Sequence, residues 1–166
     1  VRMIAPVWNY ENAFAGSCVT GGGLTARGRE FVRRAQRAGI IVDVSHLSER
    51  GFWDVCELAE APIVASHSNA KACCAHPRNL TDEQFRALCD LGGTAGLNLY
   101  AAFLHESGRA TMDDVRRHLE HFLALGGDGH LALGGDLDGC DTLPDGMHGL
   151  RDYEMLEMCL ENWGFD

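Results

Sequence analysis

The stretch "IVASHSNA", residues 63–70, is a short apolar run that stops at a polar cluster around His67. Earlier in the chain, "IIVDVSHLS", residues 40–48, repeats this pattern around His46. Apolar, β-branched runs bounded by polar residues are typical of buried strands. The two stretches therefore predict neighbouring strands that end alike, each with a histidine just beyond its last apolar residues.

Apolar runs of this kind alternate with amphipathic segments along the whole chain. The amphipathic segments open on Thr or Ser N-caps, and Thr81 with Gln84 fits a capping box. The predicted strands are residues 3–7, 40–44, 62–66, 94–99 and 130–134. The predicted helices are residues 26–38, a helix after Ser48, a helix after Thr81, and residues 111–125 and 151–162. This order predicts β-α units, and hence a parallel sheet with right-handed crossovers.

An open doubly wound sheet and part of a (β/α)8 barrel both fit these units. Polar residues follow nearly every predicted strand, namely Trp8-Asn9, Ser45-His46, Ser66-His67, Asn98 and Asp136. A barrel draws its functional residues from many strand ends at one rim. A nucleotide-binding sheet uses one glycine-rich turn, and no G-x-G-x-x-G follows a strand here. We therefore predict an α/β fold of the (β/α)8 TIM-barrel type, partial with about five β-α units, in a single domain over residues 1–166.

Composition and charge limit the expected partners. The net charge is −10 and no stripe of Lys and Arg stands out, which argues against nucleic acid as a partner. No apolar run approaches the roughly 18 residues of a membrane span, and no signal peptide opens the sequence. The seven cysteines are irregularly spaced and form no C-x-x-C pair, so we expect reduced thiols in a cytoplasmic protein.

His46 and His67 are candidate metal ligands. Adjacent strands lie about 4.8 Å apart, so imidazoles at two neighbouring strand ends could share one ion at about 2.0–2.1 Å per bond. The alternative is a pair of polar rim histidines that bond to loop backbone. The sequence pattern alone leaves both interpretations open.

Two further strand-end loops carry candidate functional groups. Arg78, in the loop after the second histidine, could bind a carboxylate with two parallel hydrogen bonds, or it could pair with Asp82 at the surface. Asp136, in "LGGDLDG" (133–139), could transfer a proton or bind a ligand, or it could simply form a turn beside glycine.

Other side chains carry weaker expectations. Asp43, inside an apolar strand, needs a partner, either a histidine that it orients or a neighbouring strand end. His118 and His121, three residues apart on a helix, are expected to be surface residues of that amphipathic helix. The helix after Ser48 is expected to turn Trp53, Cys56 and Leu58 inward.

Three segments, in this order and spacing, closely resemble one enzyme family. They are "GLTARGREFVRRAQRAGIIVDVSHLS" (23–48), "PIVASHSNAKACCAHPRNLTDEQ" (62–84) and "LALGGDLDG" (131–139). The family is that of the zinc dipeptidases typified by membrane (renal) dipeptidase, and the resemblance extends over residues 3–164. It implies a (β/α)8 barrel with a binuclear zinc centre, a metalloprotease-type hydrolase in which metal-bound hydroxide cleaves dipeptides, including some with a C-terminal D-residue.

The resemblance also implies roles for residues of this sequence. His46 and His67 match the two histidines that bind one zinc, Arg78 matches the arginine that holds the substrate carboxylate, and Asp136 matches the aspartate that handles the substrate amino terminus and the proton. Trp8, followed by Asn9, stands where the family has a histidine that polarises the substrate carbonyl. Tryptophan can donate a hydrogen bond but cannot take a proton, so we expect Trp8 and Asn9 to bind substrate with altered specificity.

A second departure is larger. The family binds its other zinc with an H-x-D pair and a bridging glutamate, and this chain contains no H-x-D. Its strands resemble barrel strands four to eight, so the chain is either the C-terminal portion of a longer enzyme or a natural truncation with one partial zinc site. Exposed sheet edges favour association, and we expect a homodimer.

Two alternatives to a dipeptidase stay open. One is a catalytically incompetent, dipeptidase-like protein that acts in binding or assembly, which the missing ligands and Trp8 favour. The other is an amidohydrolase that acts on a cyclic amide, against which the carboxylate-binding role of Arg78 argues.

Overall fold

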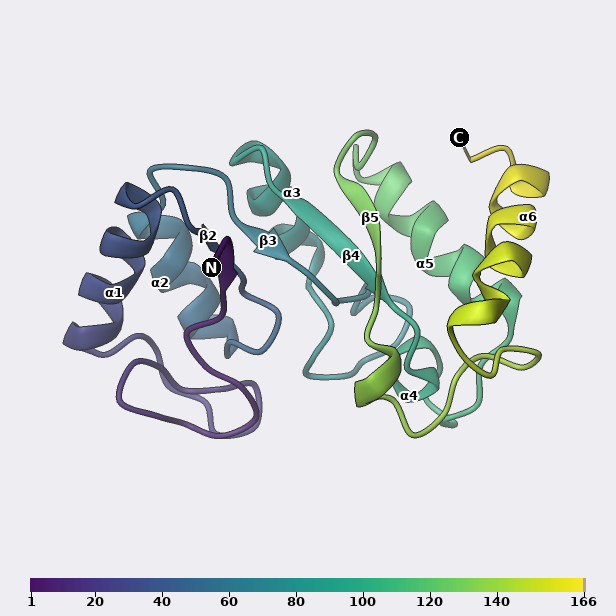
Figure 1. The fold of residues 1–166 in the computed structure, drawn as a ribbon, viewed down its shortest axis with the longest axis horizontal. Helices are drawn as coiled ribbons and strands as arrows, with labels where there is room; N and C mark the ends of the chain where they lie inside the picture. Colours follow the sequence, from purple (N-terminus) through teal and green to yellow (C-terminus); the bar gives the residue numbers. More distant parts are fainter. Residues whose placement is uncertain (166) are drawn as a thin grey trace.

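Strands and helices alternate along the chain in the computed structural model, which describes residues 1–165 (Figure 1). The strands are β1 (Met3–Ile4), β2 (Ile41–Val42), β3 (Val64–Ala65), β4 (Thr94–Asn98) and β5 (Leu131–Gly135). The helices are α1 (Ala26–Arg37), α2 (Glu49–Leu58), α3 (Asp82–Asp90), α4 (Ala101–Leu104), α5 (Met112–Ala124) and α6 (Tyr153–Trp163). Two short 3-10 helices, η1 (Leu137–Gly139) and η2 (Leu150–Asp152), follow β5. The predicted alternation is confirmed.

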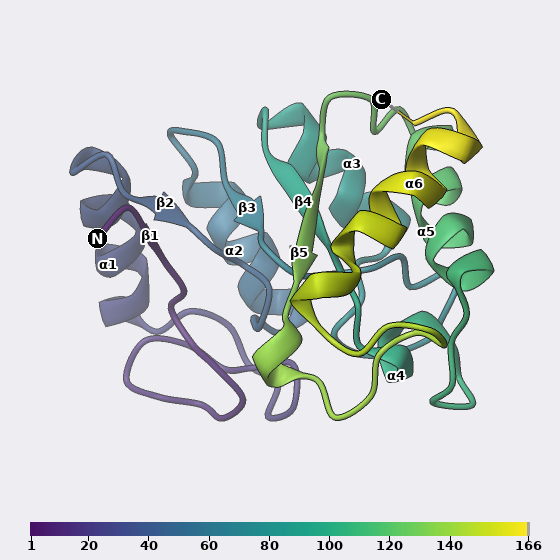
Figure 2. The ribbon, with the colours of Figure 1, turned by 45° about the vertical axis from the view of Figure 1, so that its right-hand side comes forward.

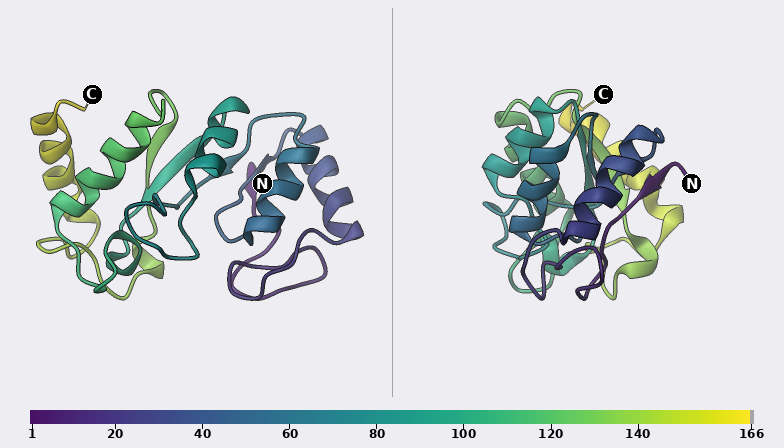
Figure 3. Two further views of the ribbon diagram at one scale, coloured as in Figure 1. Left: turned by 180° about the vertical axis from the view of Figure 1, so that it is seen from behind. Right: turned by 90° about the vertical axis from the view of Figure 1, so that its left-hand side faces the viewer.

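The strands lie side by side in the order in which the chain forms them. β1 pairs with β2, β3 with β4 and β4 with β5, all in parallel. A parallel bridge between Asp43 and Val64 joins β2 to β3, and the Val44 amide donates to the Val64 carbonyl at 2.8 Å. Helices α1, α2, α3 and α5 lie on one side of the strands (Figures 1 and 3). A doubly wound sheet reverses its strand order, and the strands within residues 1–165 show no reversal.

The helices begin where the sequence supplies capping side chains. Thr25 Oγ1 accepts from the Gly28 amide at 3.0 Å at the start of α1. Thr81 and Gln84 form the predicted capping box at the start of α3. These contacts satisfy amides that have no partner inside the helix. Gly39 follows α1 with a φ of +70°, which glycine adopts without steric cost.

The buried face of α2 differs from the prediction. Phe52 and Val55 are fully buried, whereas Trp53 is 38% exposed and meets the Phe52 ring edge-on. Cys56 and Leu58 are only partly buried against the core. Adjacent helical residues point about 100° apart, so once Phe52 faces the core Trp53 turns toward the surface.

The segment after β4 also differs, because α4 was not predicted. Its residues Ala101, Phe103 and Leu104 are buried, so this short turn of helix depends on packing rather than on length or caps. The strands are shorter than predicted. Beyond β2 and β3, backbone amides are bonded by the Asp43 side chain instead of by a neighbouring strand.

Two apolar clusters hold the helices against the strands. The first packs α1, α2 and α3 on β2 and β3 and includes Val32, Phe52 and Phe85. The second packs α5 and α6 beside β4 and includes Leu119 and Leu156. Helix α6 lies next to α5 at the β5 end of the molecule (Figure 2). The cores occupy the middle of the strands, which leaves the strand-end loops free for polar groups.

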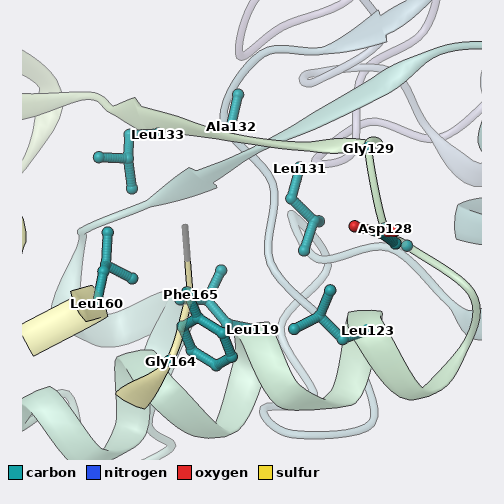
Figure 4. Close-up of a pocket in the computed structure, with 11 residues that line it drawn as sticks. Leu119, Leu123, Asp128, Gly129, Leu131, Ala132, Leu133, Leu160, Gly164 and Phe165 are labelled. Carbon is teal, nitrogen blue, oxygen red and sulfur yellow. The ribbon is translucent and has the colours of Figure 1, made fainter. Parts of the chain in front are cut away.

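Both outer strands carry exposed apolar side chains. Met3 of β1 is 44% exposed and Leu133 of β5 is 39% exposed. Beside β5 lies an apolar hollow of about 570 Å³ between α5 and α6, into which Leu131 and Leu133 point (Figure 4). Neither β1 nor β5 has a strand on its outer side among the described residues.

None of the helices within residues 1–165 is long and apolar enough to cross a membrane. All seven cysteines, which lie in the described part of the chain, are free thiols.

Candidate active site

Strands β2 and β3 bring two imidazole rings together. His46 and His67 each follow a strand end, and their Nε2 atoms are 2.9 Å apart. The ring centroids are 4.9 Å apart and the ring planes are inclined by 59°. The nitrogen edges that face each other are those with which two imidazoles can share one ion.

A chain of hydrogen bonds at His67 fixes which of its nitrogens carries the proton. Ser66 Oγ donates to Asp43 Oδ2 at 2.5 Å and lies 2.6 Å from His67 Nδ1. Because the single hydroxyl proton points to the carboxylate, His67 Nδ1 donates to Ser66 Oγ. His67 Nε2 then presents a lone pair to His46. The amides of Ser45 and Ser66 hold Asp43 Oδ1 at 3.0 and 3.1 Å, so Asp43 bonds a neighbouring strand end and also orients a histidine through Ser66.

The polar atoms of His46 are not satisfied by the protein alone. Arg78 Nη2, which can only donate, lies 3.3 Å from His46 Nε2. A proton on His46 Nε2 would repel this guanidinium, and without that proton two lone pairs face each other. His46 Nδ1 is buried without a hydrogen-bond partner among residues 1–165. A metal ion bound by both Nε2 atoms would remove the repulsion between the two facing lone pairs.

Both histidines are held in the neutral form that a metal binds. Burial, assisted by the positive charge of Arg78, lowers the pKa of His46 to about 3. The same two causes lower the pKa of His67. Within residues 1–165 no group of three or more His, Cys, Asp or Glu side chains could hold a metal. The pair therefore fits part of a metal site, since a zinc ion usually takes at least three protein ligands.

Arg78 presents unpaired donors close to this pair. The residue is 7% exposed, and its Nη1 atom has no hydrogen-bond partner in the part of the chain that the structure describes. The guanidinium lies over the Phe103 ring, 5.6 Å from its centroid. A buried guanidinium with free N–H groups favours an anion. The alternative pairing with Asp82 is wrong, because Asp82 bonds to His121 Nε2 at 2.8 Å.

Asp136 follows β5 in a left-handed conformation, with φ 64° and ψ 35°. Asn98 Nδ2 donates to its Oδ2 atom at 3.1 Å. Asn98 is itself fully buried, and the Asn69 side chain bonds both its amide and its carbonyl, at 2.9 and 3.0 Å. Asp138 is exposed in η1. Of the two aspartates, Asp136 alone is braced from a neighbouring strand end.

Most of these side chains line one cavity of about 370 Å³ at the strand-end loops. The loops themselves run along the lower edge of Figure 1. Among the walls of the cavity are the predicted residues Trp8, Asn9, His46, Arg78 and Asp136. His67 is absent from the lining and reaches the cavity through its contact with His46. Trp8 is 69% exposed, with its ring 6.4 Å from that of His46. The volume suits a small ligand.

Several residues of the site were not predicted. Ser66 and Asn98 belong to the polar clusters at strand ends, but the sequence gives no sign that they contact Asp43 and Asp136. Phe103 and Tyr100 line the cavity from the unpredicted segment around α4. Their position at the cavity depends on tertiary packing, which a local sequence pattern does not reveal.

The whole chain, residues 1–166, matches the family model described as membrane dipeptidase (Peptidase family M19). The chain belongs to the membrane dipeptidase family. One similar relative is an "Uncharacterized protein in pqqA 5'region" of Klebsiella pneumoniae, 41% identical over 178 residues, which cover 100% of this chain and 65% of the relative. An "Uncharacterized dipeptidase" of Schizosaccharomyces pombe is 38% identical over 164 residues, covering 94% of this chain and 39% of that protein.

A solved structure has the same arrangement of elements. The metallo peptidase from Rhodobacter sphaeroides, liganded with a phosphinate mimic of the dipeptide L-Ala-D-Ala, matches with a TM-score of 0.93 at 38% identity. The match covers 100% of this chain and 50% of that one. The chain thus spans 65% or less of the length of each of these relatives. The family resemblance inferred from the strand-end motifs is confirmed.

Proposed function

We propose that the protein is a zinc-dependent dipeptidase whose substrate lies in the cavity at the strand ends. The observation that carries this proposal is the meeting of an imidazole pair, an unpaired buried guanidinium and a braced carboxylate in one place. A dipeptide has a carboxylate, an amide and an amino group within a short length. These three groups could be bound by the guanidinium, the metal held by the imidazoles and the Asp136 carboxylate, respectively.

The barrel is part of the same proposal. We infer that β1 to β5 form strands four to eight of a (β/α)8 barrel. Their sequential parallel order and the helices on one side are what such an arc requires. The half-length match to the solved relative supports this inference. In the complete barrel, further strands would cover the exposed edges of β1 and β5.

His46 and His67 would hold one zinc ion through their Nε2 atoms. When bound, the zinc supplies Lewis acidity toward the scissile carbonyl and makes attack possible at neutral pH. Asp43 and Ser66 keep the His67 ring turned with its lone pair toward that position. A second zinc, as in the family site, needs ligands other than those that this chain carries.

Arg78 would bind the substrate carboxylate and so measure the substrate length. Its Nη1 atom is buried and unpaired among residues 1–165, and a planar guanidinium matches a carboxylate with two parallel hydrogen bonds. Because Arg78 also lies 3.3 Å from His46, the carboxylate would sit close to the scissile bond. This distance favours dipeptides over longer peptides.

Asp136 would accept a proton during attack and pass it to the leaving amine. Asn98 holds one carboxylate oxygen, which leaves the other free for the substrate. Trp8 and Asn9 would contact the substrate from the loop after β1, where Trp8 can donate a hydrogen bond but cannot take a proton.

The test combines metal analysis with a substrate panel. We expect the purified protein to bind zinc and to release alanine from L-Ala-L-Ala or L-Ala-D-Ala, with activity lost on chelation. Arg78→Lys should raise KM about tenfold or more, because a charged hydrogen-bond pair is lost, whereas Arg109→Lys on an exposed loop should not change KM.

Each alternative predicts a different result. Absence of both zinc and hydrolysis would support the binding or assembly protein. Hydrolysis of a cyclic amide without hydrolysis of dipeptides would support the amidohydrolase. Equal KM values for Ala-Ala in Arg78→Lys and the unmodified protein would contradict the role of Arg78.

Assembly and location complete the proposal. We propose a homodimer that works in the cytoplasm, where free thiols persist. Sedimentation of the purified protein tests the first part, and a purely monomeric species at micromolar concentration would contradict it. Fractionation of cells with an antibody to the protein tests the second.

A further inference from the structure

His118 of α5 is fully buried, although its position on an amphipathic helix predicts a surface residue. Its Nδ1 atom accepts a hydrogen bond from the Ala70 amide at 3.0 Å. Its Nε2 atom lies 3.0 Å from the Leu104 carbonyl, which can only accept, so the proton is on Nε2. Burial lowers the pKa of His118 to about 4, so the ring stays neutral and keeps both bonds near neutral pH.

The Ala70 bond fixes the loop that carries Arg78. Ala70 and Leu80 close this loop through a parallel bridge, and the Lys71 amide donates to the Leu80 carbonyl at 2.7 Å. Arg78 therefore lies in a closed loop whose first residue is bonded to the His118 ring. Any shift of Ala70 would move the base of this loop.

The Leu104 bond fixes the other wall of the same pocket. Leu104 is the last residue of α4, and its neighbour Phe103 is the ring over which the Arg78 guanidinium lies. Asn79, next to Arg78, donates through Nδ2 to the Phe103 carbonyl at 2.8 Å. One imidazole thus holds both segments that set the place of the guanidinium.

Of the neighbouring α5 side chains, Arg117 also bonds both segments, but from the surface and at Cys73 instead of at Ala70. Arg117 reaches the Leu104 and Cys73 carbonyls at 3.1 and 3.5 Å, but its side chain is 46% exposed and it does not bond Ala70. His121 bonds Asp82 on α3 instead of either loop. His118 is the α5 residue that bonds both loops from a fully buried position.

We propose that His118 is a positioning residue that sets the location of the Arg78 guanidinium for carboxylate binding. This inference rests on the proposed dipeptidase function. His118 acts from the outer helix layer and touches neither substrate nor metal. Its effect should therefore fall on substrate binding, and not on zinc content or on the chemical step.

The experiment compares His118→Phe, His118→Asn and His118→Gln with the control His121→Asn. The phenylalanine variant removes both bonds, while the asparagine and glutamine variants keep a group that can replace one of them. In His118→Phe we expect KM for Ala-Ala to rise about 10- to 100-fold, the effect of a displaced positioning group. The turnover number and zinc content of His118→Phe should change less than about twofold. The KM values of His118→Asn and His118→Gln should lie between those of the parent protein and His118→Phe.

A double-mutant cycle adds a measurement, the coupling between two KM effects, that a general loss of stability would not change. If His118 acts through Arg78, the KM effects of His118→Phe and Arg78→Lys should not add. Hydrogen exchange should also quicken in residues 69–80 and 101–104 of His118→Phe, and not of His121→Asn. Circular dichroism checks that each variant folds. If His118→Phe does not fold, the asparagine and glutamine variants test the proposal in its place.

The outcomes separate this inference from the proposed function. An active parent protein whose KM is unchanged in the His118 variants would overturn the positioning role alone. A parallel loss of zinc and turnover without a change in KM would also overturn it. A folded, zinc-loaded parent that hydrolyses no dipeptide would overturn the dipeptidase proposal and this inference with it.

Discussion

At the scale of single residues, the position of one proton decides what the imidazole pair can bind. The Ser66 hydroxyl donates to Asp43, and its oxygen accepts a hydrogen bond from Nδ1–H of His67. The Nε2 atom of His67 is therefore left with a free lone pair. The sequence indicated the two histidines and the need of Asp43 for a partner. It did not indicate Ser66, because an Asp–Ser–His chain across two strands becomes visible only when the register of those strands is known.

Ser66→Ala should lower zinc affinity about 10- to 100-fold, because groups that orient a ligating histidine have effects of this size. Without the hydroxyl, the His67 ring loses its fixed tautomer. Titration of the metal-free protein with zinc against a competing chelator measures the change. Ser68→Ala is a matched control, since Ser68 Oγ is buried without a hydrogen-bond partner in the described residues. Equal affinities for Ser66→Ala and Ser68→Ala would contradict the role of Ser66.

Asp136→Asn should lower the turnover number about 100-fold or more, the usual effect of losing a general acid-base group. The amide can keep the hydrogen-bonded position beside Asn98 but cannot take a proton. Zinc content should stay that of the parent protein. Steady-state kinetics and metal analysis of the same sample measure both quantities, and a proportional fall of turnover and zinc would assign Asp136 to metal binding instead.

At the scale of elements, local chemistry predicted the helix boundaries well and the strand lengths poorly. The caps at Thr25, Ser48 and Thr81 lie where the sequence put them, because a capping side chain acts on amides two or three residues away. Strand lengths and α4 were missed because they depend on contacts distant in sequence. The same reason explains His118, whose helical position suggested exposure and whose two partners come from separate loops.

The capping box of α3 supports a quantitative prediction. Thr81→Ala should lower the free energy of unfolding by about 1 kcal/mol, because the Gln84 amide loses its side-chain acceptor. Urea unfolding followed by circular dichroism gives this value from the midpoint at unchanged slope. Thr142→Ala, at an exposed loop position outside the helices, would report the general effect of removing a threonine. A loss no larger than for Thr142→Ala would show that the box does not stabilise α3.

At the scale of the whole molecule, the order of the predicted strands and helices indicated the fold class better than any single strand did. Five weak local signals all indicated β-α units, and polar clusters at their carboxyl ends favoured a rim over a single nucleotide-binding turn. The sequential parallel order agrees with that choice. The sequence pattern could not predict how deeply each side chain is buried, and burial sets the charge state of the histidines.

Buried neutral histidines should make the metal-free protein sensitive to acid. The folded-state pKa values of His46, His67, His76 and His118 are all lowered, chiefly by burial, whereas in the unfolded chain a histidine titrates near its ordinary value of about 6.5. Below that pH the unfolded chain binds more protons than the folded one. Stability is therefore fully present above about pH 6.5 and falls as the pH drops toward the folded-state values.

His118 offers a way to isolate one contribution. Its pKa is lowered to about 4, so between about pH 6 and pH 4 it should add roughly 1.4 kcal/mol per pH unit to the slope of the unfolding free energy. Urea unfolding of the metal-free parent and His118→Gln at several pH values measures the difference in slope. Parallel curves for parent and His118→Gln would contradict a lowered pKa of His118 in the folded protein.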